Sequence, residues 1–541
     1  PDQVPMLLRL AAQGEEDPVR RTLMFVRAGA WDDAQQSLAD AATDMLAHDE
    51  GAQVLRMAEQ FPAHIQAGSP LLAYARGLCA WPHYQYGAVR SAMEQAFAGF
   101  DAMGRHQDAQ RARAMHALAT FFCGHMEEAR RLSQVVRAKP MDLETETLSE
   151  LLDFWYEGYH GPLEGPGHRL ARVVDLLARG GGAELWFRCM IRVNVFSSRP
   201  GVSAQIKRLV HGARAATGDE RWSLQANANL TEAGLLFWQG KFAELEAAVQ
   251  RIEEDSRWLG RPVGLRIRLL TLKVYCQVIC DDKDTVRASC DAIVAHVSSL
   301  DRSSDLPLAI LSVVMLALTA VGDWQAVRML LPTLQGEVVK NPSQQMFLRT
   351  FGAQLALHEG RVDEALTTLR ELVTRSTQLD TMYLDATVRT WLALAELADG
   401  SPTAAWAALE PLIEDTAASG NVGRVLFTGM QVLTKLSLAA WGGAASSEGL
   451  AVLRQWVETA RRFKAGTHEQ PPVPAANDAG LSARELEVLA LLADSQSNKL
   501  IARALDLSPH TVKRHVARIL DRLDLASRMQ AANWYRVRFG N

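Results

Sequence analysis

A short glycine-led junction recurs along the chain and limits what the chain can fold into more than any other feature. Each copy starts with a glycine. Acidic or polar residues follow it, and a small or apolar residue comes next, within five positions of the glycine. The copies start at Gly29, Gly124, Gly240, Gly322, Gly360 and Gly400. A glycine in the left-handed conformation commonly ends a helix, and acidic residues are favoured in the first turn of the next. The junction therefore predicts pairs of helices that pack closely where the small residue lies.

The spacing of these junctions indicates a repeated unit. Gly322, Gly360 and Gly400 are 38 and 40 residues apart, and the junctions resemble degenerate tetratricopeptide repeats, whose period is about 34 residues. We expect an all-α fold in which residues 1–463 form a tetratricopeptide-like helical solenoid. Such a solenoid has an inner groove, lined by the first helix of each pair, that suits peptides, small ligands or partner helices. The alternative is a non-repetitive helical domain with ordinary glycine caps.

Composition narrows the class of protein further. With 541 residues the chain is too long for a single core, and an aromatic content of only 7% favours helices over an all-β build. Six cysteines are too few for a disulfide scaffold, so we expect a reducing, cytoplasmic location. The N-terminus lacks the pattern of a secretory signal. The longest apolar run, residues 306–321, is shorter than the roughly 20 residues of a membrane span, so we expect no membrane partner.

The C-terminal part differs from the rest in charge. Residues 464–480 read KAGTHEQPPVPAANDAG and predict a linker, because three prolines and small polar residues interrupt any apolar period. Residues 481–541 hold ten basic and six acidic residues, a net charge of +4, whereas the remaining 47 basic and 56 acidic residues give −9. A basic domain on an acidic body suggests a polyanionic partner for the domain.

The residues after the linker predict four helices that include a helix-turn-helix. Ser482 and Glu485 form a capping-box pattern at the start of the first helix. A second helix is expected at about 497–505, a third after the N-cap Ser508, and a fourth at about 527–537. In the third helix an apolar stripe (Val512, Val516, Ile519, Leu520 and Leu523) alternates with residues off the stripe (His510, Lys513, Arg514, Arg518 and Arg522). A helix of this kind fits the major groove of DNA.

Four motifs in this segment resemble the LuxR-type DNA-binding domain. They are R-E-x-E-V-L at 484–489, N-K-x-I-A at 498–502, L-x-x-S-x-x-T-V-K-x-H at 505–515 and L-x-x-x-x-R-x-x-A at 523–531. The resemblance implies that the third helix reads bases and that the fourth supports dimerisation. The DNA-binding candidates are Lys499, Ser508, Thr511, Lys513, Arg514, His515, Ala517 and Arg518. Arg484 and Glu485 are equally open to a structural or a DNA-facing role, and Ser495, Asp506 and Asp524 replace the family's common turn glycines.

A helical-repeat region ahead of such a domain resembles, more weakly, the MalT-like regulators. Those proteins usually carry an N-terminal NTPase, but Gly240-Lys241 has neither the spacing nor the Ser/Thr of a P-loop. We therefore expect a chain without that NTPase, either a fragment or a regulator that lacks it. The function implied is transcription regulation in response to a small-molecule or protein effector. We expect the protein to bind double-stranded promoter DNA as a homodimer, and RNA polymerase is a candidate partner. The alternative is a solenoid adaptor for protein docking with auxiliary DNA binding.

Other candidate sites are weaker. Aromatic and polar residues that could line a groove for an anionic or polyol ligand are Trp155, Tyr156, Tyr159, Trp186, Arg188, Arg192, Gln225 and Asn229. Core packing and a solvated helix face are the alternatives for them. Cys276 and Cys280 lie one helical turn apart, which suits a thiolate site or simply buried helical cysteines. No nucleophile–base pair or paired carboxylate set stands out, so we expect neither an enzyme nor a cofactor or metal.

Overall fold

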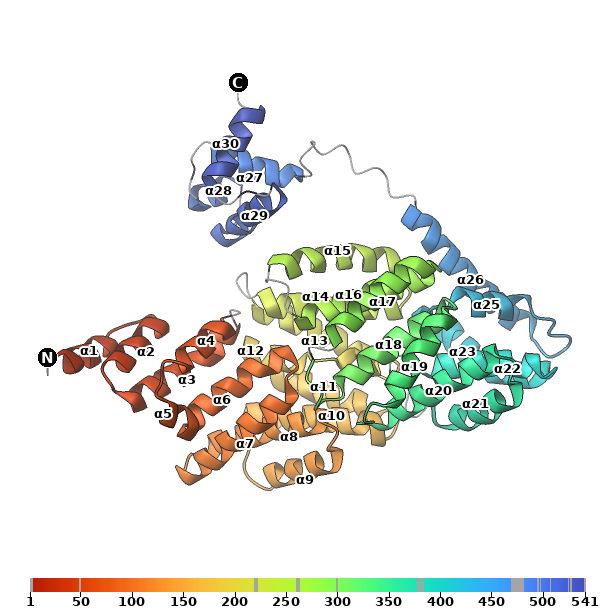
Figure 1. Ribbon diagram of the computed structural model, residues 1–541, viewed down its shortest axis with the longest axis horizontal. Coiled ribbons are helices and arrows are strands. Elements are labelled where there is room, and N and C mark those ends of the chain that lie inside the picture. The colour runs from red at the N-terminus through yellow and green to blue at the C-terminus, as the bar shows by residue number, and fades with distance from the viewer. Residues whose placement is uncertain are drawn as a thin grey trace.

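The computed structural model describes the chain apart from residues 1–2, 48–49, 218–221, 259–262, 298–299, 377–380, 382–383, 469–480, 494–495, 497, 506, 524, 526–527 and 540–541. Every regular element in the described part is a helix, which confirms the all-α prediction (Figure 1). Across these residues, no helix is both long enough and apolar enough to cross a bilayer.

Helices follow one another with short connections throughout the body. The first elements are α1 (Val4–Gln13), α2 (Pro18–Arg27), α3 (Trp31–Ala47), α4 (Gly51–Ala58), α5 (Ala63–Gly68), α6 (Pro70–Ala80), the 3₁₀ helix η1 (Trp81–His83), α7 (Tyr86–Ala102), α8 (His106–Phe122) and α9 (Met126–Arg137). The next are α10 (Leu143–His160), α11 (Gly165–Ala178), α12 (Ala183–Cys189), η2 (Val193–Phe196), α13 (Val202–Thr217), α14 (Trp222–Trp238), α15 (Phe242–Trp258), α16 (Val263–Ile279) and α17 (Lys283–Val297). The body continues with α18 (Leu306–Ala320), α19 (Trp324–Gln335), α20 (Pro342–His358), α21 (Val362–Ser376), α22 (Leu384–Ala398), α23 (Pro402–Ser419), α24 (Gly423–Leu426), α25 (Met430–Leu438) and α26 (Ser447–His468). Helix α26 thus extends into the segment predicted as a linker, and the rest of that segment lies outside the described residues.

The recurring junctions form as the sequence predicts. All six junction glycines have a positive φ, for example +68° at Gly322 and +79° at Gly360, so each supplies the left-handed turn. The residue five positions after each glycine is fully buried; these residues are Ala34, Ala129, Leu245, Val327, Ala365 and Ala405. A small or branched side chain at this point lets the helix after the turn pack directly on the helix before it.

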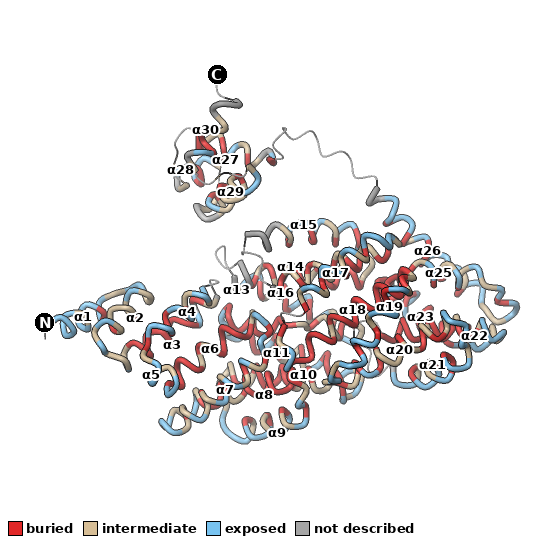
Figure 2. Tube along the Cα trace, viewed as in Figure 1, coloured by how far each residue is buried: buried red, intermediate tan, exposed pale blue. Residues whose placement is uncertain are grey.

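The helices form two layers of stacked pairs. Most helices of the body pack on the next in sequence, as α7 does on α8 and α10 on α11, and the alternate helices α14, α16, α18, α20 and α22 also contact one another in turn. This second set of contacts stacks one helix pair on the following pair. Figure 2 shows the buried residues concentrated along these shared surfaces.

The array also folds back on itself, which an open groove would not predict. Gly87 donates its backbone N–H to Asp301 at 2.6 Å, and the Gln431 side chain donates to the carbonyl of Val321 at 3.1 Å. The rings of Tyr275 and Phe427 lie 4.6 Å apart. Because these partners are far apart in sequence, one continuous core runs from α6 to α26. The main core is therefore shared by segments that lie far apart in the sequence.

Two smaller cores lie outside this main core. The first joins α1, α2, α3 and α4 to α6, and the second belongs to the C-terminal helices alone. The C-terminal helices thus have apolar packing of their own, as expected of a separate domain.

Candidate nucleic-acid interface

Four helices make up the C-terminal domain: α27 (Ala483–Ala493), α28 (Asn498–Ala504), α29 (Pro509–Arg522) and α30 (Arg528–Phe539). Their core is built from apolar residues of all four helices and one residue two positions before α27; these are Leu481, Val488, Leu489, Leu492, Ile501, Ala502, Val512, Val516, Ile519 and Ala531. Helices α28 and α29 follow one another across a short turn, which is the helix-turn-helix that the sequence predicts.

Side-chain caps fix the starts of α27 and α29. The Ser482 N–H donates to Glu485 Oε2 at 2.8 Å, and the Glu485 N–H donates to Ser482 Oγ at 3.2 Å, which confirms the capping box. At the next helix, Ser508 has an extended backbone and its Oγ accepts from the Thr511 N–H at 3.0 Å. Such a cap satisfies one of the free N–H groups of the first turn. Ser508 and Thr511 therefore set where α29 begins.

Helix α29 has one buried face and one polar face. Val512 and Ile519 are fully buried and Val516 nearly so, which holds the helix on the domain core. Lys513 is exposed, and Arg514, His515, Ala517 and Arg518 are half-buried. The basic side chains predicted to meet DNA thus lie together on the face of α29 turned away from the core.

His515 differs from its basic neighbours. Burial, followed by the nearby charge of Arg518, lowers its pKa below the usual value. This shift favours the neutral imidazole at neutral pH, so His515 differs from the charged Lys513, Arg514 and Arg518.

Two residues left open by the sequence have structural contacts. Glu485 is only 2% exposed and accepts a hydrogen bond from Arg522 of α29 as well as from Ser482. Arg484 donates to the carbonyl of Leu505, in the turn before α29, and pairs with Glu487. These contacts favour the structural role for Arg484 and Glu485. Through its bond to Glu485, Arg522 connects α29 to α27.

Arg528, whose role the sequence left unassigned, ties the fourth helix to the second. It donates to Asn498 Oδ1 at 2.6 Å and to the backbone carbonyl of Gln496. The signal was present in the sequence, because Arg528 belongs to the fourth family motif. Lys499 and His510 have side chains outside the described residues, as do Ser495, Asp506 and Asp524.

Three of the eight ligand candidates in the body lie close together, because Trp155 and Tyr159 both pack on Phe196 and Arg192 lies against Trp155. Trp155 is 1% exposed and packs edge-on against Phe122 and Phe196, with ring centroids 5.1 and 5.3 Å away. Tyr159 and Trp186 are also buried in the core. Arg188 is buried and pairs with both Glu144 and Glu184.

The remaining candidates are less buried. The Tyr156 hydroxyl donates to Glu127, and Asn229 accepts from Arg214. Gln225 is half-buried on α14. Arg192 pairs with Asp305 and lies against Trp155, and it also lines a pocket described below.

The cysteines show no thiolate site in the described part of the chain. Cys276 on α16 and Cys280 just after that helix are half-buried, and burial raises the pKa of Cys276. Burial also raises the pKa of Cys290 to about 12. Among the described residues, no group of three or more His, Cys, Asp or Glu side chains is arranged to hold a metal ion.

Comparison with known proteins agrees with this geometry. Residues 479–535 match the family described as "Bacterial regulatory proteins, luxR family". The nitrate/nitrite response regulator protein NarL of Escherichia coli (strain K12) is 46% identical over 54 residues, which are 10% of this chain and 25% of NarL. The transcriptional regulatory protein LiaR of Bacillus subtilis (strain 168) is 46% identical over 52 residues, covering 10% of this chain and 25% of LiaR.

A third relative extends slightly further. The transcriptional regulatory protein DegU of Brevibacillus brevis is 42% identical over 64 residues, 11% of this chain and 27% of DegU. The chain spans about a quarter of the length of the curated relatives it matches. At its C-terminus, therefore, the chain carries a DNA-binding domain of the LuxR family.

Proposed function

We propose that the chain is a cytoplasmic transcription regulator whose helical body receives a small-molecule or protein signal and controls binding of the C-terminal domain to promoter DNA. The body is a helical-repeat sensor of the MalT-like kind in this proposal, with no enzymatic activity and with RNA polymerase as a candidate partner. The observation that carries the proposal is helix α29, which belongs to a LuxR-family domain and presents Lys513 on its exposed face.

The chemistry of this face suits double-stranded DNA. Lys and Arg side chains donate to the O6 and N7 atoms of guanine in the major groove and to phosphates on either side. Lys513, Arg514 and Arg518 are our candidates for base contact. The cap residues Ser508 and Thr511 and the first turn of α29 are candidates for phosphate contact, because a helix N-terminus favours anions.

We further propose that the protein binds DNA as a homodimer. One domain of this size presents little surface to DNA, and dimers of such motifs bind half-sites about one helical turn apart. Our candidate contact is α30, with Met529, Ala532 and Trp534. Ala532 and Trp534 also pack on the domain core, so a partner would cover only the part of α30 that remains accessible. Analytical ultracentrifugation with a two-half-site duplex should give a 2:1 complex, whereas a stable 1:1 complex on a single half-site would contradict this stoichiometry.

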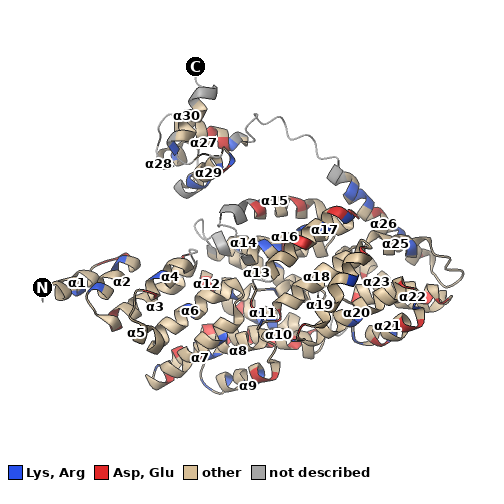
Figure 3. Ribbon diagram, in the orientation of Figure 1, with Lys and Arg blue, Asp and Glu red and all other residues tan. Residues whose placement is uncertain are grey.

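Control by the body has a physical basis in charge. Residues 1–480 carry −9 and residues 481–541 carry +4. Helix α29 contacts α15, on which Figure 3 shows acidic residues. Among the described side chains of α15, Glu244 is exposed and Glu246 is half-buried. We propose that in the off state α15 covers the DNA-facing side of α29. A ligand that binds the released state more tightly than the covered state would then increase DNA binding.

The experiment starts with the full chain and fragments of promoter DNA. Selection of bound fragments followed by footprinting should give one protected site whose affinity falls steeply with salt. The same site is then titrated with residues 477–541 alone. Masking predicts weaker binding per domain by the full chain without effector. If the full chain and residues 477–541 bind with equal affinity per domain, once dimerisation is accounted for, the body does not mask the domain and is only tethered to it. Binding without sequence preference would favour the adaptor alternative.

A further inference from the structure

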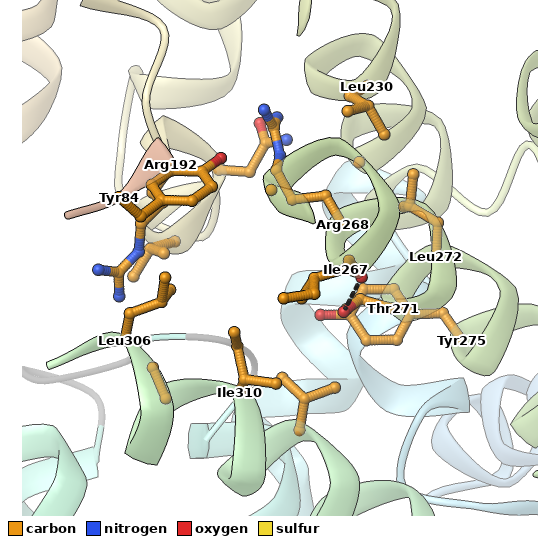
Figure 4. Close-up of a pocket in the computed structure, with 16 residues that line it drawn as sticks. Tyr84, Arg192, Leu230, Ile267, Arg268, Thr271, Leu272, Tyr275, Leu306 and Ile310 are labelled. Carbon is orange, nitrogen blue, oxygen red and sulfur yellow. Dashed lines mark hydrogen bonds between the residues drawn. The ribbon is translucent and has the colours of Figure 1, made fainter. Parts of the chain in front are cut away.

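A pocket opens between the inner helices of the body, in a place that no candidate from the sequence covers except Arg192. Its volume is about 160 Å³, and its walls come from α14, α16, α18, η2 and the residue after η1. Figure 4 shows Tyr84 and Arg192 on one side of this space, with Leu306 and Ile310 of α18 along another. Helix α16 supplies the wall that bears Ile267, Arg268 and Thr271.

Two residues of the wall have unusual backbone conformations. Tyr84 has φ +58° and Arg192 has φ +54°, and among the described residues Asp281 alone joins them as a non-glycine with positive φ. Such conformations are strained and persist where the surrounding contacts hold them, commonly at ligand sites. Here both lie at the same pocket.

Neighbouring residues hold this strained wall in place. A Cβ atom on Gly264 would lie 2.2 Å from the Tyr84 ring, so the glycine lets that ring rest directly on α16. Arg192 is fixed by Asp305 of the α17–α18 connection, with Nη1 2.6 Å from Oδ1. The wall is therefore built from close contacts between segments distant in sequence, which is how a preformed pocket is made.

The pocket combines an apolar lining with one uncompensated cation. Leu230, Leu272, Leu306, Ile310 and Val313 supply most of the apolar surface. The charge of Arg192 is neutralised by Asp305. Arg268, by contrast, donates to neutral oxygens, Asn227 Oδ1 at 2.6 Å and Thr231 Oγ1 at 3.3 Å, and pairs with no carboxylate in the described part of the chain.

We propose that this pocket binds a small monocarboxylate with an apolar body about the size of one ring, its carboxylate on Arg268. The size follows from the volume, since an apolar cavity of about 150 Å³ is filled by benzene. The charge follows from Arg268, because guanidinium and carboxylate form strong charge-assisted hydrogen bonds. The binding site stands on these observations alone. Its role as the effector site rests on the proposed function.

The position of the pocket suits that role. Its lining helices α14, α16 and α18 contact α24, α26 and α25 respectively. Helix α26 is the last element of the body before the C-terminal domain. A ligand that changes the spacing of α14, α16 and α18 would therefore act on the helices that lead to the DNA-binding domain.

The test is isothermal titration of the full chain with benzoate and cyclohexanecarboxylate, each compared with its neutral amide. We expect at least one acid to bind about tenfold more tightly than its amide. Arg268→Gln should remove this preference, whereas Arg266→Gln, which removes the same charge from α16 outside the pocket lining, should retain it. Ala309→Leu, which fills the space, should weaken binding of acids and amides alike, and circular dichroism checks that each variant is folded.

The proposal is overturned if neither acid binds more tightly than its amide, or if Arg268→Gln leaves the preference intact. The proposed function is tested separately in the same preparations by DNA binding. If acids bind but the protein shows no site-specific DNA binding, the pocket stands and the regulator fails. If DNA binding is specific but unchanged by a bound acid, the pocket stands as a binding site and its effector role is refuted.

Discussion

The body and the C-terminal domain use their basic residues in different ways. In the body, the buried Arg188 pairs with Glu144 of another helix, and Arg192 pairs with Asp305 of the α17–α18 connection. Arg370 pairs with the buried Glu396. In the C-terminal domain, Lys513 is exposed on α29 and has no acidic partner among the described residues. These arginines of the body hold segments of the chain together, whereas Lys513 of α29 keeps its charge available for another molecule.

This difference shows why a count of basic residues does not locate a binding surface. Arg188 and Arg192 look like ligand contacts in sequence, but both are ion-paired to carboxylates. Arg522 lies on the basic side of its helix in sequence, yet it bonds to Glu485. What separates a structural cation from a candidate contact is whether a carboxylate of the same chain neutralises it.

The largest effect should come from breaking a buried pair of the body. Arg192→Gln leaves Asp305, whose side chain is 7% exposed, buried without its cation, and we expect a loss of about 3–5 kcal/mol in the free energy of unfolding. The control is Arg462→Gln, because Arg462 and Glu458 form a largely exposed pair worth about 0–1 kcal/mol. Urea unfolding followed by circular dichroism makes the comparison, and equal losses for the two variants would show that burial does not distinguish the pairs.

A second variant tests the other side of the comparison. Lys513→Ala removes a charge that makes no ion pair in the described chain, so we expect the free energy of unfolding to stay within about 0.5 kcal/mol. Sequence-specific DNA affinity should fall by about 1–3 kcal/mol. Fluorescence anisotropy with a specific duplex measures this, and Lys435→Ala, on the exposed surface of the body, is the charge-matched control. An unchanged footprint for Lys513→Ala would remove this residue from the interface.

The smallest effect should come from the cap of α29. Ser508→Ala removes the acceptor for the Thr511 N–H and should cost about 1 kcal/mol of stability in the C-terminal domain. Ser508→Gly should lower the stability by only about a few tenths of a kcal/mol, since glycine is tolerated at the N-cap position. Thermal unfolding of residues 477–541 gives both values, and a larger loss for glycine than for alanine would mean that Ser508 does not act as a cap.

Local features of the C-terminal domain could be predicted because their causes are local. The capping box and the N-cap of α29 depend on residues three positions apart, and the predicted helices at 497–505 and 527–537 compare with α28 (Asn498–Ala504) and α30 (Arg528–Phe539). The glycine junctions of the body were predictable for the same reason. In each, one glycine and the residues just after it determine the turn.

The pocket and the folding back of the body were not predicted, since they depend on contacts between distant segments. No residue near Tyr84 or Arg192 in the sequence indicates a positive φ. Nothing in the sequence distinguishes Arg268 from the other arginines of its helix. Asp305 joins Arg192, Asn341 and Gln344, and no spacing in the sequence relates these residues. Such sites become visible only when the chain is folded.

The most direct test of the account is the salt dependence of DNA binding by three proteins: the full chain, residues 477–541, and residues 1–468. We predict that the first two bind a selected promoter site, with log affinity falling linearly as log salt rises, and that the body alone does not bind it, because its buried arginines are neutralised within the fold. Binding of the site by residues 1–468 with a comparable slope, or an affinity of residues 477–541 that is indifferent to both salt and sequence, would contradict the account.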